Sequence, residues 1–141
     1  SEREGDHNWI LLRNDPMVAL IPPGHPLAKE TSVPMEAFAV ESYIQTYPGQ
    51  DVDNARIFSR YHITPNTQFS TMDINATYSM VEAGLGISIS NLVNSYLWQD
   101  RVVHLPLEPN QTMNIGLAYG KNISPASEAF LHFITDKLPE Y

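Results

Sequence analysis

The sequence reads ALIPPGHPLA over residues 19–28, and this stretch decides the fold. An apolar run typical of a buried strand meets Pro22, Pro23 and Pro26 within a few residues. Because proline donates no backbone hydrogen bond and fixes its own φ angle, it cannot continue a sheet. The sequence therefore predicts a strand that stops at Pro22 and a change of course in the chain.

Outward from this point, short apolar runs alternate with helix-like segments along the chain. That alternation is typical of an α/β protein. We expect WILL and MVALI to form one strand or a strand pair, and we expect four further strands and one extended run: YIQTY, TQFST, GISIS, MNIGLAY and VVHLPL. The segments expected to be helical are VPMEAFAVE, DVDNARIFSRYH up to Pro65, and a helical turn in NLVNSYLW.

Two further helices have clear sequence signals. The stronger is predicted by apolar residues at steps of four, three and four, with Asp73 near the first turn and Gly84 at the C-terminal cap: Ile74, Tyr78, Val81 and Leu85. The last helix is predicted to begin at Pro125 with Ser124 as its cap. We expect its packing residues to be Phe130, Ile134 and Leu138.

Composition excludes several classes of protein. A chain of 141 residues with 43% hydrophobic residues can bury a real core in one or two small lobes. A net charge of −8 without a basic run argues against direct binding to nucleic-acid phosphates. The absence of cysteine excludes disulfides and thiolate metal sites. No apolar run approaches the roughly 20 residues of a membrane span, and the polar start is unlike a signal peptide, so we expect a cytoplasmic protein with no membrane partner.

Catalytic and cofactor motifs are absent or incomplete. The G-x-G at Gly84 and Gly86 follows a predicted helix, whereas a dinucleotide fingerprint follows a strand and needs a third glycine where Ile89 stands. Ser88 resembles the serine of a nucleophile elbow, but the segment is typical of a strand interior. The five histidines show no metal-ligand spacing. We therefore predict no catalytic residue, no cofactor and no metal site.

Two polar clusters at predicted strand ends remain as candidate binding residues. Gln45, Thr46 and Tyr47 follow one strand, and Ser70, Thr71 and Met72 precede the Asp73 helix. In an open α/β sheet, ligands bind beyond the carboxyl ends of the strands, where helix N-termini offer free N–H groups. Thr71 and Asp73 are equally typical of helix caps, and composition does not decide between the two interpretations.

Five segments taken in order resemble the effector-binding domain of LysR-type transcriptional regulators. The resemblance covers residues 9–138, and its specific elements are strand-P-P-G-H-P-L-A and M-V-E-A-G-L-G-I-S-I in this order. The segments are DPMVALIPPGHPLA, SYIQTYPGQDVDNARIFSRYHITPNTQFSTMD, YSMVEAGLGISIS, VVHLPLEP and IGLAYGKNISPASEAFLHFI.

The resemblance implies a two-lobed fold built like a periplasmic binding protein, with a small effector between the lobes. MVALI resembles the first strand that crosses between the lobes, and VVHLPL the return crossing. Residues 22–104 would form lobe two, and residues 1–21 and 105–141 would form a partial lobe one. In the family, a helix-turn-helix domain that this chain lacks contacts DNA.

The resemblance also implies effector-binding roles for Thr46, Tyr47, Thr71 and Met72, to which the strand-end analysis adds Gln45. One departure stands at residues 90–91, where Ser-Asn replaces the Leu-Pro common in relatives. The geometry of that strand end is therefore open.

The function expected is a non-enzymatic sensor that binds a small polar or anionic effector and controls a DNA-bound regulator. A solute-binding protein for transport is the alternative, because it shares the fold class. An incomplete lobe one would leave the apolar side chains of the last strand and helix uncovered, so we expect a homo-oligomer.

Overall fold

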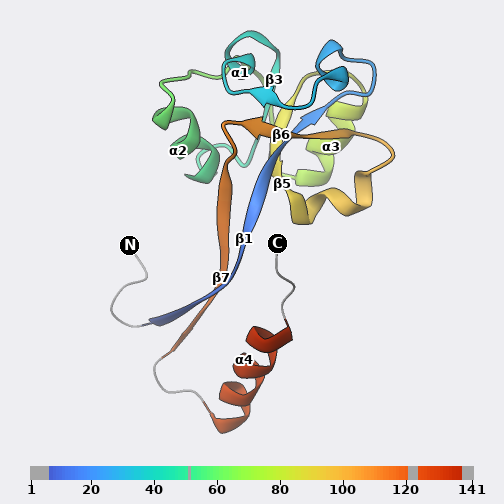
Figure 1. Ribbon diagram of the computed structural model, residues 1–141. Helices are drawn as coiled ribbons and strands as arrows, with labels where there is room; N and C mark the ends of the chain where they lie inside the picture. Colours follow the sequence, from blue (N-terminus) through green and yellow to red (C-terminus); the bar gives the residue numbers. More distant parts are fainter. Residues whose placement is uncertain (1–6, 51, 121–123, 138–141) are drawn as a thin grey trace. The chain divides into compact units, whose positions relative to one another are not determined.

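The computed structural model describes residues 7–50, 52–120 and 124–137, and Figure 1 traces them along the chain. The chain divides into two compact units. The larger unit is Pro16–Thr112, and the smaller combines Ser1–Asp15 with Met113–Tyr141. The α/β class predicted from the sequence is confirmed by the mixed order of helices and strands.

A long first strand, β1 (His7–Ile21), runs through both units, so WILL and MVALI form one strand and not a pair. Its second half lies between two antiparallel neighbours, β6 (Val103–Glu108) and β5 (Ser88–Asn91). The short strand β2 (Val33–Pro34) adds to β6 in parallel. This sheet forms the centre of the larger unit.

Two more strands extend the larger unit on the β5 side. The strands β3 (Tyr43–Thr46) and β4 (Thr67–Thr71) pair in parallel. A parallel bridge from Tyr43 to Ile87 joins β3 to the residue just before β5. The strands β3, β4 and β5 therefore run in one direction, and their carboxyl ends meet at one edge.

Helices cover both faces of these strands. The helix α2 (Val52–Arg60) and the helix α3 (Ile74–Glu82) lie on opposite sides of the sheet in Figure 1. The remaining helical segments are the short helix α1 (Ala37–Val40) and the 3-10 helices η1 (Pro26–Lys29) and η2 (Leu92–Trp98). The helix α2 ends at Arg60, before the predicted stop at Pro65.

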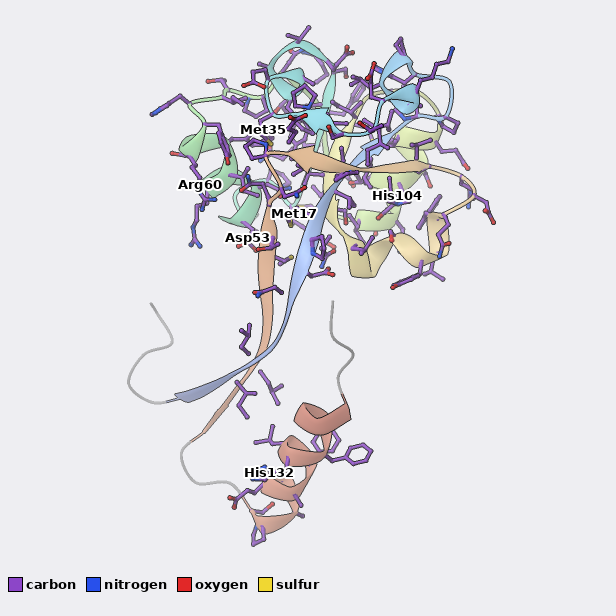
Figure 2. The ribbon with its side chains drawn as sticks, in the orientation of Figure 1. Met17, Met35, Asp53, Arg60, His104 and His132 are labelled. Atoms are coloured by element: carbon purple, nitrogen blue, oxygen red, sulfur yellow. The ribbon has the colours of Figure 1, made fainter. Side chains whose placement is uncertain are left out.

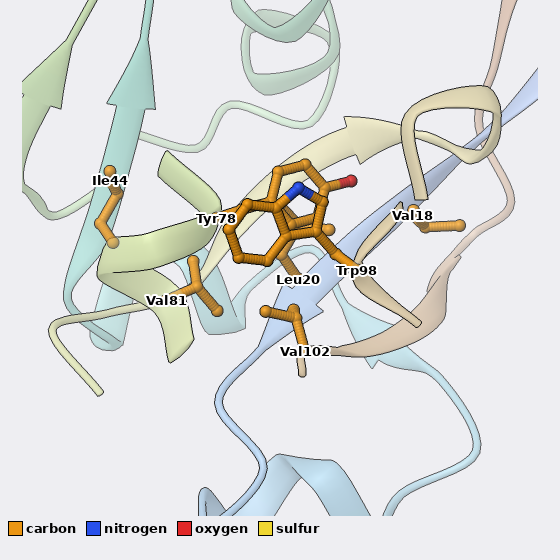
Figure 3. Packing of buried hydrophobic residues seen from close by; sticks show 7 residues of the cluster. All are labelled: Val18, Leu20, Ile44, Tyr78, Val81, Trp98 and Val102. Atoms are coloured by element: carbon orange, nitrogen blue, oxygen red, sulfur yellow. The ribbon is translucent and has the colours of Figure 1, made fainter. Parts of the chain in front are cut away.

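A buried apolar cluster holds α3 and η2 against the sheet. Figure 3 shows the aromatic ring of Tyr78 stacked on the indole of Trp98, with ring centroids 5.2 Å apart. The guanidinium carbon of Arg101 lies over the same indole, 4.2 Å from the ring centroid. The cluster is completed by aliphatic side chains from two strands, from α3 and from the segment after η2: Val18, Leu20, Ile44, Val81 and Val102.

The proline-rich stretch that follows β1 forms a capped turn. The strand ends at Ile21 as predicted, and His25 is the N-cap of η1. The backbone N–H of Leu27 donates to His25 Nδ1 at 3.0 Å, and His25 Nε2 lies 3.1 Å from a carboxylate oxygen of Glu41. His25 therefore fixes the turn at the start of the second half of the sheet.

The G-x-G stretch has a structural role. Gly84 adopts a left-handed φ of 84°, which is typical of the residue that follows a helix end. A Cβ atom on Gly86 would lie 2.5 Å from the backbone oxygen of Ser42, so only glycine fits. Leu85 was predicted to extend α3, and this prediction is wrong, because α3 ends at Glu82 and Leu85 lies in the exposed turn.

The smaller unit holds the other half of β1, the strand β7 (Thr112–Gly120) and the helix α4 (Pro125–Lys137). The strand β7 pairs with β1. The predicted cap is confirmed, since the N–H of Ser127 donates to Ser124 Oγ at 3.1 Å. Phe130 was predicted to pack but is 58% exposed, and Leu131 is buried instead. The side chains of Ile134 and Leu138 lie outside the described residues.

The unit boundaries differ from the lobe boundaries expected from the sequence. The chain returns from the larger unit between Thr112 and Met113, at the start of β7. The predicted return crossing, VVHLPL, forms most of β6 inside the larger unit, where Val103 to Pro106 pair with β1. The assignment of residues 22–104 to a second lobe stays a prediction.

Candidate functional site

The two polar clusters predicted from the sequence lie side by side. In the parallel β3 and β4 pair, Thr46 stands opposite Thr71, and Gln45 stands opposite Ser70. Both strands end here, so Tyr47 and Met72 are the first residues beyond the sheet edge. The structure therefore brings together two clusters that are about 25 residues apart in the sequence.

The backbone links the two strand ends beyond the last ladder pair. The N–H of Tyr47 donates to the carbonyl oxygen of Thr71 at 2.8 Å. Tyr47 adopts a positive φ of 53°, which is uncommon for a residue other than glycine. Its carbonyl oxygen in turn accepts from the N–H of Gln50 at 2.9 Å. This tight turn fixes the exposed Tyr47 side chain at the edge of the sheet.

Gln45 and Thr46 point to opposite faces, because side chains alternate along a strand. Thr46 is buried on the α3 side, where its Oγ1 lies 2.6 Å from Thr77 Oγ1. Gln45 lies on the α2 side, in a pocket of about 310 Å³ that includes Asn54 and Phe58. The Gln45 side chain therefore lies on the opposite face of the sheet from the side chain of Thr46.

Thr71 and Asp73 do act as capping residues. The N–H of Asp73 donates to Thr71 Oγ1 at 3.2 Å, and the N–H of Asn75 donates to Asp73 Oδ1 at 2.9 Å. The Asp73 carboxylate thus occupies part of the N-terminus of α3. Because Thr71 Oγ1 only accepts in this contact, its own hydroxyl proton can be donated to a ligand.

Met72 adds an apolar surface beside these polar groups, since its side chain is 56% exposed. Phe69, two residues before Thr71 on β4, is also exposed. A pocket edge that combines an exposed apolar side chain with hydroxyl and backbone donors suits a small organic molecule.

Sequence analysis missed two buried hydroxyls that support this edge. Thr77 of α3 bonds to Thr46 as described above, and Ser88 Oγ of β5 donates to the carbonyl oxygen of Ile44 at 2.7 Å. Thr77 stands four residues after Asp73, on the face that packs on the sheet. A threonine four residues after the helix cap was the sequence signal that could have identified Thr77. Ser88, buried and bonded within a strand, is not an exposed nucleophile.

Neither a metal cluster nor a membrane span is present in the described part of the chain. Among residues 7–50, 52–120 and 124–137, no group of three or more histidine or acidic side chains could hold a metal ion. None of the described helices is long and apolar enough to span a membrane.

The sheet with helices on both faces defines an open α/β domain, a class in which small molecules bind beyond the carboxyl ends of the strands. Comparison with known proteins identifies the family. Over residues 1–139 the chain matches the LysR substrate binding domain. The chain belongs to this family, whose effector-binding domains have a two-lobed fold like that of periplasmic binding proteins.

Curated relatives are transcriptional regulators. An uncharacterized HTH-type transcriptional regulator, YybE of Bacillus subtilis, is 28% identical over 97% of this chain. The RuBisCO operon transcriptional regulator of Allochromatium vinosum is 29% identical over 86% of this chain. The chain spans 48% and 42% of the lengths of these two proteins.

Solved structures give the same fold. The effector-binding domain of QuiR in complex with shikimate is 31% identical and has a TM-score of 0.83, covering 98% of this chain and 68% of that one. The regulatory domain of CcmR from Synechocystis, in complex with 2-PG, has a TM-score of 0.80 at 20% identity and supports the fold alone. The match covers 98% of this chain and 71% of the CcmR chain.

Proposed function

We propose that this chain is the effector-sensing part of a LysR-type transcriptional regulator, and that its effector binds at the carboxyl ends of β3 and β4. The observation that carries the proposal is the pairing of Thr46 with Thr71 at that edge. The exposed Tyr47 and Met72 and the half-buried Thr71 supply the contacts, and the buried Thr46 supports them from beneath. Gln45 contributes from the α2 side of the same strand end.

The effector class that fits this edge is a small polar molecule with hydroxyl groups. Thr71 offers a hydroxyl donor and acceptor, whereas the Asp73 carboxylate at the α3 N-terminus repels a negative charge placed directly on that helix. QuiR, at 31% identity, is described with shikimate, a molecule that carries three hydroxyls and one carboxylate. Its hydroxyl side suits the threonines of this chain.

DNA is contacted by a separate helix-turn-helix domain, since this chain carries a net charge of −8 and its curated relatives include an HTH-type regulator about twice its length. The chain itself catalyses no reaction in this proposal. A regulator that acts on DNA works in the bacterial cytoplasm. The regulator relatives favour this role over the transport alternative.

The test is a titration of the chain with a panel of small hydroxylated acids and polyols, of which shikimate is the first. Binding is monitored by the backbone amide signals in NMR spectra. We expect the amide signals of Thr46, Tyr47, Thr71 and Met72 to shift before those of the exposed Arg56 on α2. The change Thr71→Val removes one hydroxyl hydrogen bond of about 1 kcal/mol, so affinity falls roughly several-fold.

The matched control is Thr67→Val, at the exposed amino end of the same strand. It should leave affinity unchanged, because Thr67 stands at the opposite end of β4 from Thr71. Unchanged binding by Thr71→Val, together with shifts centred elsewhere, would show that the site is not at this edge.

A further inference from the structure

The sulfur atoms of this chain are all thioethers, because the sequence has five methionines and no cysteine. Without a thiol to compete, the methionine sulfur is the side-chain atom that a peroxide oxidises most readily, and the product is methionine sulfoxide. The rate at each methionine follows the exposure of its side chain to the solvent. Burial therefore determines which methionine of this chain reacts first.

Burial separates the five methionines clearly, and all of them lie in the part of the chain that the structure describes. Met35 and Met17, both labelled in Figure 2, are 0% and 5% exposed. Met80 on α3 and Met113 on β7 are half-buried. Met72 is 56% exposed, and it is the only one of the five in the exposed class.

The backbone on both sides of Met72 is held by bonds that do not use its side chain. The carbonyl oxygen of Thr71 accepts from the N–H of Tyr47 at 2.8 Å, and Thr71 Oγ1 accepts from the N–H of Asp73 at 3.2 Å. An oxygen atom added to the Met72 sulfur therefore leaves the fold intact. The same atom on the fully buried Met35 would place an unpaired polar group in the core.

Met72 also lies at the edge where the proposed function places the effector, as the first residue beyond β4. A sulfoxide replaces the apolar thioether by a dipolar S–O group, which is a hydrogen-bond acceptor and is hydrated in the free protein. An organic effector that packs against this group must displace its water without supplying a bond in return. Oxidation therefore weakens the apolar contact that Met72 offers.

We propose that Met72 is an oxidation site through which a peroxide lowers the affinity of the effector edge. With hydrogen peroxide, a lone pair of the Met72 sulfur attacks one oxygen, so that a sulfur–oxygen bond forms and the oxygen–oxygen bond breaks. The departing hydroxide takes the proton of the transferred oxygen and leaves as water. The sulfur loses two electrons and the peroxide gains them.

The modification is reversible, because methionine sulfoxide reductases remove the oxygen as water, with one enzyme for each sulfoxide epimer. The change in affinity rests on the proposed function. The selective oxidation of Met72 rests only on its exposure, so the two can be tested separately.

The oxidation site is tested by treating the folded chain with hydrogen peroxide and following the oxidised peptides by mass spectrometry over time. We expect Met72 to react at least roughly ten-fold faster than Met17 and Met35, with Met80 and Met113 between them. The control is the same reaction in urea, where the chain is unfolded and all five methionines should react at similar rates. Equal rates for Met72 and Met35 in the folded chain would overturn the proposal.

The effect on affinity is measured by calorimetric titration of shikimate and the rest of the panel, before and after peroxide treatment. We expect oxidation to lower the affinity roughly five-fold, and treatment with both reductases to restore it. Met72→Leu has no sulfur at this position, so peroxide should leave its affinity, whatever the starting value, unchanged. Met80→Leu is the matched control, and it should lose affinity on oxidation as the unmodified chain does.

The outcomes separate this proposal from the proposed function. If the panel binds at the edge and peroxide changes nothing, or if Met72→Leu loses as much affinity as the unmodified chain, the proposal is wrong and the proposed function stands. If no panel molecule shifts the amide signals of Thr71 and Met72, the proposed function fails together with the change in affinity, and the peptide rates still decide the oxidation site. The melting temperature of the oxidised chain should equal that of the untreated chain, and a fall would show that oxidation acts through the core instead.

Discussion

The helices α3 and α4 both follow strands, yet they differ in what covers them. On α3 the side chains of Thr77, Tyr78 and Val81 are buried against the sheet. On α4 the aromatic side chains of Phe130 and Phe133 are 58% and 59% exposed. Large exposed aromatics on one helix are typical of a surface that another chain segment covers. The apolar face of α3 is therefore covered within its own unit, whereas the described part of α4 presents apolar area to solvent.

The largest expected effect tests the burial of α3 against the sheet. Tyr78→Ala removes a fully buried ring that stacks on Trp98, so we expect a loss of about 3 to 5 kcal/mol in the free energy of unfolding. The measurement is urea unfolding followed by tryptophan fluorescence. Phe130→Ala is the counterpart on α4 and should cost less than about 1 kcal/mol at concentrations where the chain is monomeric. Equal losses for the two variants would show that the contrast between the helices is wrong.

Association is the next largest expected effect. We propose that Phe130 is covered by a second copy of the chain, since leaving such a side chain exposed forfeits roughly 1.5 to 3 kcal/mol. The change Phe130→Ser should lower the association constant by roughly ten-fold. Sedimentation velocity over a dilution series measures it.

The control for association is Leu97→Ser, at a strongly exposed leucine in the larger unit. That variant should associate as the unmodified chain does. A monomer at every concentration for the unmodified chain would contradict the expected homo-oligomer.

The strand ends could be predicted because their signals are local. Pro22 ends β1, and Asp73 caps α3 with its own side chain, so each boundary is determined by residues within a few positions. The same holds for the polar clusters at Thr46 and Thr71, which follow their strands directly. Their pairing follows from the parallel order of an α/β sheet.

Other features depend on contacts between distant residues and had no local signal. The sequence around Gln111 does not indicate its hydrogen bonds to Arg60 and Tyr61, which are about 50 residues away in the sequence. The exposure of Phe130 was missed for a similar reason, because a helical period shows which residues share a face but not whether anything covers it.

The smallest expected effect concerns His104 of β6, whose ring lies beside that of Tyr78 with ring centroids 5.8 Å apart. Burial lowers its pKa from the ordinary value of 6.5, so the unfolded chain takes up this proton more readily than the folded chain. The stability that His104 contributes is therefore fully present above about pH 6.5 and is lost as the pH falls toward its folded pKa. His104→Leu removes this titration, so its melting temperature should fall less than that of the unmodified chain between pH 7.5 and pH 5. The comparison variant is His62→Asn, which removes an exposed histidine at a positive φ of 55° that asparagine tolerates and leaves His104 in place. Equal falls in melting temperature for His104→Leu and the unmodified chain would mean that the imidazole is protonated as easily in the folded chain as in the unfolded chain, so that burial does not lower its pKa.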